Sequence, residues 1–145
     1  MNTDHYKKLK NMYLSAPINT QMYETTHCEI NLEKATITLT IAEKYFHALG
    51  AMHGSVYFKL LDDAAFFAVN SIIEDVFVLT TSFNIHFLRP VSSGTITAIG
   101  QVTSKTEKGF VAESALYNEA GKKMAYGTGQ FVKSKMRLTR EIGYC

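Results

Sequence analysis

The chain has 145 residues, of which 46% are hydrophobic and 19% are charged, and its formal net charge is +2. This length fits one domain over residues 1–145, and a composition this apolar excludes an intrinsically disordered protein. The small positive charge gives no reason to expect a nucleic acid partner, and no apolar run reaches the ~20 residues of a membrane span.

The sequence also bears on the cellular compartment of the protein and on its need for a metal or cofactor. Cys28 and Cys145 stand far apart and lack the spacing of a metal site, and the N-terminus lacks the apolar segment of a signal peptide. These features favour a cytoplasmic protein. Because zinc-type spacing, a serine elbow and a phosphate-binding glycine loop are all missing from the sequence, we expect no metal and no cofactor.

The first predicted elements are a short helix and two strands. Residues Asp4 to Leu14 place apolar side chains at helical spacing, and Pro17 is expected to end this helix. From Thr25 the hydrophobic period changes to two, which predicts two strands up to Ile41 joined by a turn at residues 31–34. His5, His27 and His86 are interpreted as surface or strand histidines rather than ligands.

A long buried helix follows over Met52 to Ile73. Its apolar residues spread nearly all the way round, which is typical of a helix enclosed by other elements. With ~20 residues it would be ~30 Å long. A core helix of an all-α bundle is the usual interpretation of such a segment, but everything after it has the pattern of strands.

Four strands are predicted after this helix, at residues 76–88, 95–106, 110–117 and 123–132, and tight turns favour an antiparallel meander. Residues from Lys135 onward are expected to form a loose tail. The pattern therefore predicts an α+β domain, with a curved antiparallel sheet of five to six strands around one long central helix and a short N-terminal helix. Its core is expected roughly at residues 25–134.

Two adjacent acids on the long helix differ in their predicted surroundings. Asp63 follows Lys59 by four residues and is interpreted as the partner in an ion pair on the helix surface. Asp62 instead has Phe58 and Phe66 four residues to either side. A carboxylate held against apolar rings is costly, so Asp62 is the candidate for attack on a thioester or activation of water.

The start of the helix is the second candidate for chemistry. A helix N-terminus offers unpaired N–H groups, and Gly54 would let another molecule approach the backbone closely. Such a site suits an oxyanion, although a simple helix start explains His53-Gly54-Ser55 as well. His53 and Asp62 are nine residues apart, so they face opposite sides of the helix and are ~13 Å apart along its axis. This separation indicates a site shared between two antiparallel copies of the helix in a homodimer.

The order of the motifs resembles the PaaI-like branch of the hotdog-fold acyl-CoA thioesterases. The similar stretches are HALGAMHGSVYFKLLDDAAFFAVNS, TTSFNIHFLRPVSSGTITAIGQV and YNEAGKKMAYGTGQF. The resemblance implies a hotdog fold, hydrolysis of an acyl-CoA thioester, and a dimer or tetramer with coenzyme A along the interface. It assigns Asp62 as nucleophile or general base, the Gly54 N–H of the other subunit as the oxyanion donor, His53 as support for that loop, and Thr80 as a residue that helps to place water.

Two positions depart from the family pattern. His47 stands where relatives usually have Asn, and Ser55 stands in place of the second Gly. Unlike an amide, a histidine titrates near neutral pH, so rate and substrate preference remain open. We nevertheless count His47 among the catalytic candidates, and the substrate-binding candidates are Ser55, Phe58, Phe66, Thr81, Ser82 and Arg89. The aromatic residues among them have core packing as the alternative.

Other activities remain open from the sequence. A hotdog domain can bind an acyl-CoA without hydrolysing it, because a fold does not fix a function. A hydratase or dehydratase on the same fold is a further alternative, although no matching signature is present. The sequence gives neither the acyl group nor the choice between coenzyme A and an acyl carrier protein.

Overall fold

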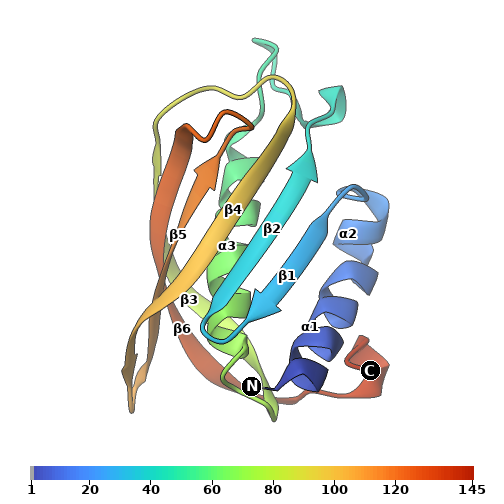
Figure 1. Ribbon diagram of the computed structural model, residues 1–145, viewed down its shortest axis with the longest axis vertical. Helices are drawn as coiled ribbons and strands as arrows, with labels where there is room; N and C mark the ends of the chain where they lie inside the picture. The colour runs from blue at the N-terminus through green and yellow to red at the C-terminus, as the bar shows by residue number, and fades with distance from the viewer. Residues whose placement is uncertain (1) are drawn as a thin grey trace.

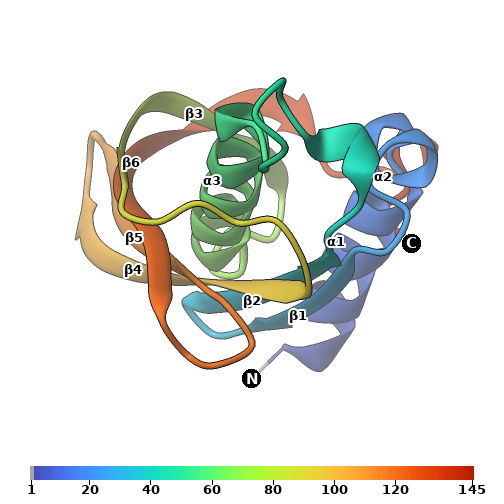
Figure 2. The same cartoon turned by 90° about the horizontal axis from the view of Figure 1, so that it is seen from above.

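One six-stranded antiparallel sheet curls around a single long helix in the computed structural model, which describes residues 2–145 (Figures 1 and 2). This arrangement confirms the predicted class and the predicted central helix. The strands are β1 (His27–Asn31), β2 (Lys34–Thr40), β3 (Val76–Phe87), β4 (Thr95–Thr106), β5 (Gly109–Tyr117) and β6 (Lys123–Arg137). The helices are α1 (Thr3–Ser15), α2 (Pro17–Gln21) and α3 (Gly54–Asn70), with 3-10 turns η1 (Glu43–Tyr45) and η2 (Arg140–Ile142).

The strand order corrects the predicted meander of four strands. The order is β1-β2-β4-β5-β6-β3, so β4, β5 and β6 form a meander but β3 lies beyond β6 at the far edge. The segment between β3 and β4, residues 88–94, crosses the end of the molecule above α3 (Figure 2). It contains Pro90 and is too long for a two-residue hairpin turn, which is why β3 and β4 need not be neighbours.

Small residues allow α3 to lie very close to the middle of the sheet. A Cβ added at Gly100 of β4 would come within 2.2 Å of the carbonyl oxygen of Ala64. On β5, the Ser114 hydroxyl donates a 2.8 Å hydrogen bond to the carbonyl of Leu61. These contacts fix the rotation of α3 about its own axis. The wide apolar side of the helix therefore packs on β4 and β5, and a narrower stripe of its side chains faces away from these strands.

A bulge in β3 changes which of its side chains face the helix. Thr80 pairs with Phe131, but Ser82 pairs with the adjacent Gln130, so Thr81 is the extra residue on β3. Before the bulge buried Val78 and, two residues later, Thr80 face α3, whereas after it Phe83 packs on the core. The bulge therefore turns Thr80 toward the helix and leaves its two neighbours exposed.

The two ends of the chain pack together beside the sheet, which corrects two sequence-based predictions and adds one helix that was not predicted. Pro17 does begin a break after α1, but it also starts the unpredicted helix α2. The expected loose tail is ordered, because β6 continues to Arg137 and η2 follows. His5 is buried rather than superficial: its Nε2 lies 2.8 Å from the Asn70 carbonyl oxygen and its Nδ1 lies 2.7 Å from the Tyr144 hydroxyl.

The outer edge of β3 is unpaired in the single chain. Among residues 2–145 this strand of 12 residues is hydrogen-bonded only to β6, whereas β1 at the other edge has α1 beside it (Figure 1). Long exposed edges are usually covered in native proteins. Separately, no helix within residues 2–145 is both long and apolar enough to span a membrane.

Candidate active site

Asp62 lies in the middle of α3 on the side that faces β3. Its Oδ1 accepts a 2.8 Å hydrogen bond from the Thr80 hydroxyl. The ion pairs found among residues 2–145 do not include Asp62. The carboxylate is half-buried, and among the described residues it has one neutral hydrogen-bond donor and no ion-pair partner.

The surroundings of Asp62 make its carboxyl group unusually basic. Burial raises the pKa of Asp62 from 3.8 to about 6, with a smaller contribution in the same direction from the negative charge of Asp63. The hydrogen bond from Thr80 and the positive charge of Lys59 act in the opposite direction and only partly offset burial. A carboxylate of this kind is ionised at neutral pH yet basic enough to accept a proton from water.

Asp62 and Thr80 line an apolar cavity of about 630 Å³. This volume is in the usual range of ligand sites, which hold a mainly apolar molecule and a few polar groups. Its walls come from α1, α2, α3, β3 and the C-terminal segment, and its apolar members include Met12, Ile18, Phe66, Phe67, Phe77, Leu79, Met136 and Ile142. Four of these lining residues are also exposed at the protein surface, with between 42% and 55% of their surface accessible: Ile18, Leu79, Met136 and Ile142.

Asp63 is paired as the sequence suggested. Its Oδ2 lies 2.7 Å from the Lys59 ammonium, and the Tyr13 hydroxyl donates to the same oxygen at 2.6 Å. Tyr13 belongs to α1, so its hydrogen bond to Asp63 joins the N-terminal helix to α3. The two adjacent acids thus have different environments, one paired and one unpaired.

The other candidate residues lie at the start of α3. His53 is the N-cap of the helix, and its Nδ1 accepts from the Ser55 backbone N–H at 3.0 Å and lies 2.8 Å from the Ser55 hydroxyl. Because Nδ1 accepts, the neutral ring carries its proton on Nε2. The Gly54 N–H has no acceptor within residues 2–145, as is usual for the first turn of a helix.

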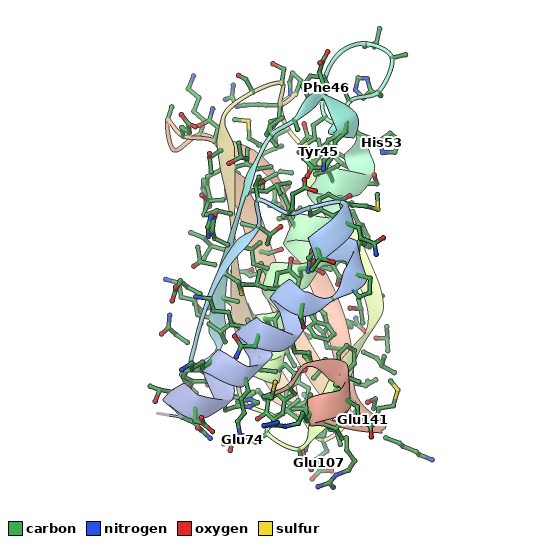
Figure 3. The ribbon with its side chains drawn as sticks, turned by 90° about the vertical axis from the view of Figure 1, so that its right-hand side faces the viewer. Tyr45, Phe46, His53, Glu74, Glu107 and Glu141 are labelled. Carbon is green, nitrogen blue, oxygen red and sulfur yellow. The ribbon has the colours of Figure 1, made fainter. Side chains whose placement is uncertain are left out.

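Figure 3 shows His53 near Tyr45 and Phe46 at one end of α3, while Glu74 lies at the opposite end of the molecule. The His53 backbone N–H donates to the Tyr45 carbonyl at 2.8 Å, which fixes the loop before the helix.

A second hollow of about 430 Å³ opens at this end of α3. It is lined by His47, Gly54, Arg89 and neighbouring residues of the segment after β3. The His47 Nδ1 accepts from the Leu49 N–H at 3.1 Å, and the Arg89 carbonyl accepts from the Tyr57 hydroxyl at 2.9 Å. The side chains of His47 and Arg89 are exposed here, where they are available to a bound molecule.

Within one chain the two groups of candidates stay apart. Asp62 and Thr80 line the apolar cavity, whereas Gly54 and His47 line the second hollow. Gly54 and Asp62 are eight residues apart on α3, which corresponds to ~12 Å along the axis. A single subunit does not bring both to one small reacting group.

The remaining candidates are divided between these regions. Phe66 lines the apolar cavity. Phe58 is 40% exposed and packs edge-on against Phe83, outside both hollows. Thr81 and Ser82 are exposed on the other face of the bulge, with the Thr81 hydroxyl donating to the Gln130 carbonyl. Their predicted roles in substrate binding stay predictions.

The sequence analysis missed the walls that the two ends of the chain provide. Met12, Tyr13 and Ile18 reach the apolar cavity from the N-terminal helices, and Met136 and Ile142 reach it from the C-terminal segment. The helical spacing of apolar residues in α1 could have predicted that the N-terminal helices pack against the domain and supply part of the wall. The C-terminal segment had no such signal, since the tail has no regular hydrophobic period.

Comparison with solved structures supports the fold. The E. coli PaaI protein, from the phenylacetic acid degradation operon, superposes with a TM-score of 0.83 at 22% identity, covering 94% of this chain and 97% of PaaI. A conserved protein from Pseudomonas aeruginosa gives a TM-score of 0.76 at 20% identity, with 83% and 96% covered. A hypothetical thioesterase from Streptococcus pneumoniae gives 0.71 at 17% identity, with 77% and 92% covered. These matches confirm the predicted hotdog fold and the predicted likeness to PaaI.

No curated protein matches the sequence. The sequence profile of the thioesterase superfamily matches residues 49–125, from the loop before α3 into β6 and thus more than half of the chain. The matched range includes Asp62, Gly54 and Thr80, the residues that the geometry singles out. The chain therefore belongs to the thioesterase superfamily.

Proposed function

We propose that the protein hydrolyses acyl-CoA thioesters and that Asp62 is the catalytic carboxylate. The observation that carries this proposal is the position of Asp62, an unpaired acid on a buried helix at the wall of an apolar cavity. Its environment makes it basic enough to take a proton from water at neutral pH.

The proposed reaction needs only the substrate and water. Asp62 removes a proton from a water molecule as the water oxygen attacks the thioester carbonyl, and the carbonyl oxygen becomes an oxyanion. The tetrahedral intermediate then breaks its C–S bond, the leaving thiolate of coenzyme A takes the proton held by Asp62, and the free acid remains with the Asp62 carboxylate restored. Direct attack by the Asp62 carboxylate, followed by hydrolysis of the anhydride, gives the same products. The Thr80 hydroxyl, held at 2.8 Å from Asp62, is placed to orient the carboxylate or the water.

The oxyanion donor in this proposal is the Gly54 N–H of the partner subunit. A free N–H at the positive end of a helix dipole stabilises developing negative charge. Because Gly54 and Asp62 lie ~12 Å apart along one helix, a second antiparallel copy of α3 is required to supply it.

Two surfaces favour a homodimer of this kind. The unpaired edge of β3 can continue the sheet into a second copy. Beside it, α3 leaves one stripe incompletely buried, formed by Gly54, Phe58, Asp62 and Phe66 at intervals of four residues. A 40% exposed Phe58 on an otherwise buried helix is the kind of apolar surface that a partner covers. Light scattering at several concentrations would distinguish a dimer from a tetramer.

The cavity beside Asp62 indicates an apolar acyl group larger than acetyl. Its walls are mostly aliphatic and aromatic side chains, and its volume of about 630 Å³ is far larger than an acetyl group needs. Aromatic acyl groups belong in the test panel because the structurally similar PaaI comes from a phenylacetic acid degradation operon.

The proposal is tested by following thiol release from acetyl-, hexanoyl-, dodecanoyl- and phenylacetyl-CoA. We expect turnover of one or more of the larger substrates, and a loss of ~10²-fold or more in Asp62→Ala. Equal rates for the two proteins would eliminate Asp62 as the catalytic group, and the absence of turnover throughout the panel would argue against hydrolysis of these thioesters.

Gly54→Pro tests the oxyanion role without disturbing the helix. Proline is well tolerated at the first helical position, and His53 already has the extended φ −62° and ψ 145° that a residue before proline prefers. The change removes the N–H and adds a ring whose Cβ would lie 3.4 Å from the Phe87 side chain. Gly54→Ala is the matched control, because it keeps the N–H and its Cβ would meet Phe87 at an ordinary 3.4 Å.

Mixing two inactive variants then tests whether the site is shared. In a heterodimer of Asp62→Asn and Gly54→Pro subunits, one site regains both wild-type groups. Random 1:1 reassembly should therefore restore about a quarter of the wild-type sites. Failure to restore activity, with heterodimers demonstrated by mass spectrometry, would place both groups within one subunit.

Binding of acyl-CoA without hydrolysis is a second candidate function, favoured by one observation. The Ser55 N–H is already occupied by His53, so the start of α3 offers the single Gly54 donor to an oxyanion in place of two adjacent donors. Tight calorimetric binding of a dodecanoyl-CoA that is not turned over would support this alternative.

A further inference from the structure

Lys59 occupies a position on α3 from which either neighbouring acid is within reach. It precedes Asp62 by three residues and Asp63 by four, and both spacings bring side chains together on a helix. In the structure the ammonium is bonded to Asp63 at 2.7 Å and makes no ion pair with Asp62. The Lys59 side chain is only 10% exposed, so its pairing with Asp63 rather than Asp62 is determined by contacts inside the protein.

The contacts that fix this choice come from the N-terminal helices. The Tyr13 hydroxyl donates to the Asp63 carboxylate at 2.6 Å. The Lys59 ammonium donates to the Asn19 side-chain oxygen at 2.8 Å and to the Tyr13 hydroxyl at 3.2 Å. With Asp63 these partners use all three ammonium donors. The ammonium also lies over the rings of Tyr13 and Tyr23, 5.0 and 4.6 Å from their centroids.

From this geometry we infer that Tyr13, Asn19 and Asp63 are positioning residues for the reaction: they hold the charge of Lys59 away from Asp62 and so keep the catalytic carboxylate unpaired. The inference rests on the proposed role of Asp62. An ion pair with Lys59 would stabilise the carboxylate and weaken it as a base or nucleophile. In the part of the chain that the structure describes, the hydrogen-bond partner of the Asp62 side chain is the neutral Thr80 hydroxyl.

No other charged group near Asp62 among the described residues forms an ion pair with it in place of Lys59. Asp63 on α3 and Tyr13 on α1 belong to the cluster itself, and β3 contributes the non-titrating Thr80. Arg137, at the end of β6, lines the same cavity without an ion pair to Asp62. The direction of each charge effect agrees with the geometry, because the negative charge of Asp63 raises the pKa of Asp62 and the positive charge of Lys59 lowers it.

Two substitutions should change the basicity of Asp62 in opposite directions. Asp63→Asn removes the anion that holds Lys59, so the ammonium can turn to Asp62. The acid limb of the kcat/KM profile should then move down by about one pH unit, and the plateau rate should fall. Lys59→Met keeps the length of the side chain but removes its charge, so the limb should move up. The double variant Lys59→Met/Asp63→Asn removes both charges and should lie between the two.

A direct titration separates this inference from the proposed function. Carbon-13 NMR of the Asp62 carboxyl group, assigned with Asp62→Asn, reports its pKa without substrate or turnover. Should Asp62→Asn keep full activity, the proposed function fails, while the NMR titrations still decide whether the cluster controls Asp62. Asp62 pKa values that are the same in wild type, Asp63→Asn and the double variant, or that move in the same direction in both single variants, would overturn the inference. If Lys59→Met fails to fold because it leaves the Asp63 carboxylate buried without its ion-pair partner, the double variant takes its place in the titrations.

Discussion

Replacing Asp62 with asparagine should abolish hydrolysis and at the same time stabilise the fold. The carboxylate is held in a site that disfavours its charge, as its pKa of about 6 against an ordinary 3.8 indicates. One pH unit corresponds to roughly 1.4 kcal/mol, so the ionised form is disfavoured by up to about 3 kcal/mol. Since the side chain is partly exposed to water, about 1–2 kcal/mol of that should be measurable. Asparagine can still accept the Thr80 hydrogen bond and carries no charge.

The pH dependence of this gain has a definite sign. A group with a raised pKa in the folded state stabilises the protein below its unfolded pKa, and this stability is lost as the pH rises through the folded pKa. Wild type should therefore lose stability between about pH 4 and about pH 6.5, a loss that Asp62→Asn does not share. The advantage of the variant should be largest near neutral pH and small near pH 4.

Thermal unfolding at a fixed protein concentration tests this, because oligomerisation makes Tm depend on concentration. For a chain of this size, about 1–2 kcal/mol corresponds to a rise in Tm of roughly 2–8 °C near pH 7.5. Asp75→Asn, at an exposed position, is the matched control and should leave Tm unchanged. An Asp62→Asn variant that is no more stable than wild type near pH 7.5, or whose advantage is the same at pH 4, would refute the argument that burial destabilises this carboxylate.

Three further changes test other parts of the structure. Thr80→Val removes a hydrogen bond that lowers the pKa of Asp62, so the acid limb of kcat/KM should move up by roughly half a pH unit, whereas Thr80→Ser should restore the wild-type profile. Gly100→Ala would place a Cβ 2.2 Å from the Ala64 carbonyl oxygen and should lower the free energy of unfolding in urea by about 2–3 kcal/mol. The control Gly121→Ala, where there is open space but a φ of +81°, should lower it by about 1 kcal/mol. Equal losses of stability in the two variants would argue against close packing of α3 on β4. Tyr144→Phe breaks the hydrogen bond to His5 and should lower the free energy of unfolding by about 1 kcal/mol, and no change would mean that this contact does not hold the C-terminal segment.

Residue spacing along α3 was enough to predict the difference between its two acids. The positions four residues from Asp62 are aromatic and the position four before Asp63 is a lysine, and helical periodicity turns this pattern directly into different surroundings. The bulge at Thr81 could not be predicted in the same way, because the run Thr80-Thr81-Ser82 has no hydrophobic alternation that marks which residue is extra. The position of β3 at the far edge was also missed, because strand order depends on where a long connection crosses, which local patterns do not encode.

Much of the apolar cavity is built by residues outside the part of the chain that matches the superfamily profile. That match covers residues 49–125 and includes the catalytic candidates. The walls from α1, α2 and the C-terminal segment lie outside it, as do Tyr13 and Asn19, which hold Lys59 on Asp63. If the proposed function holds, the catalytic groups lie in the segment that matches the superfamily profile, while the two ends of the chain shape the apolar cavity and the charge balance beside Asp62. Acyl preference and pH profile should therefore depend on the two ends of the chain, even where the residues of α3 are the same as in a relative.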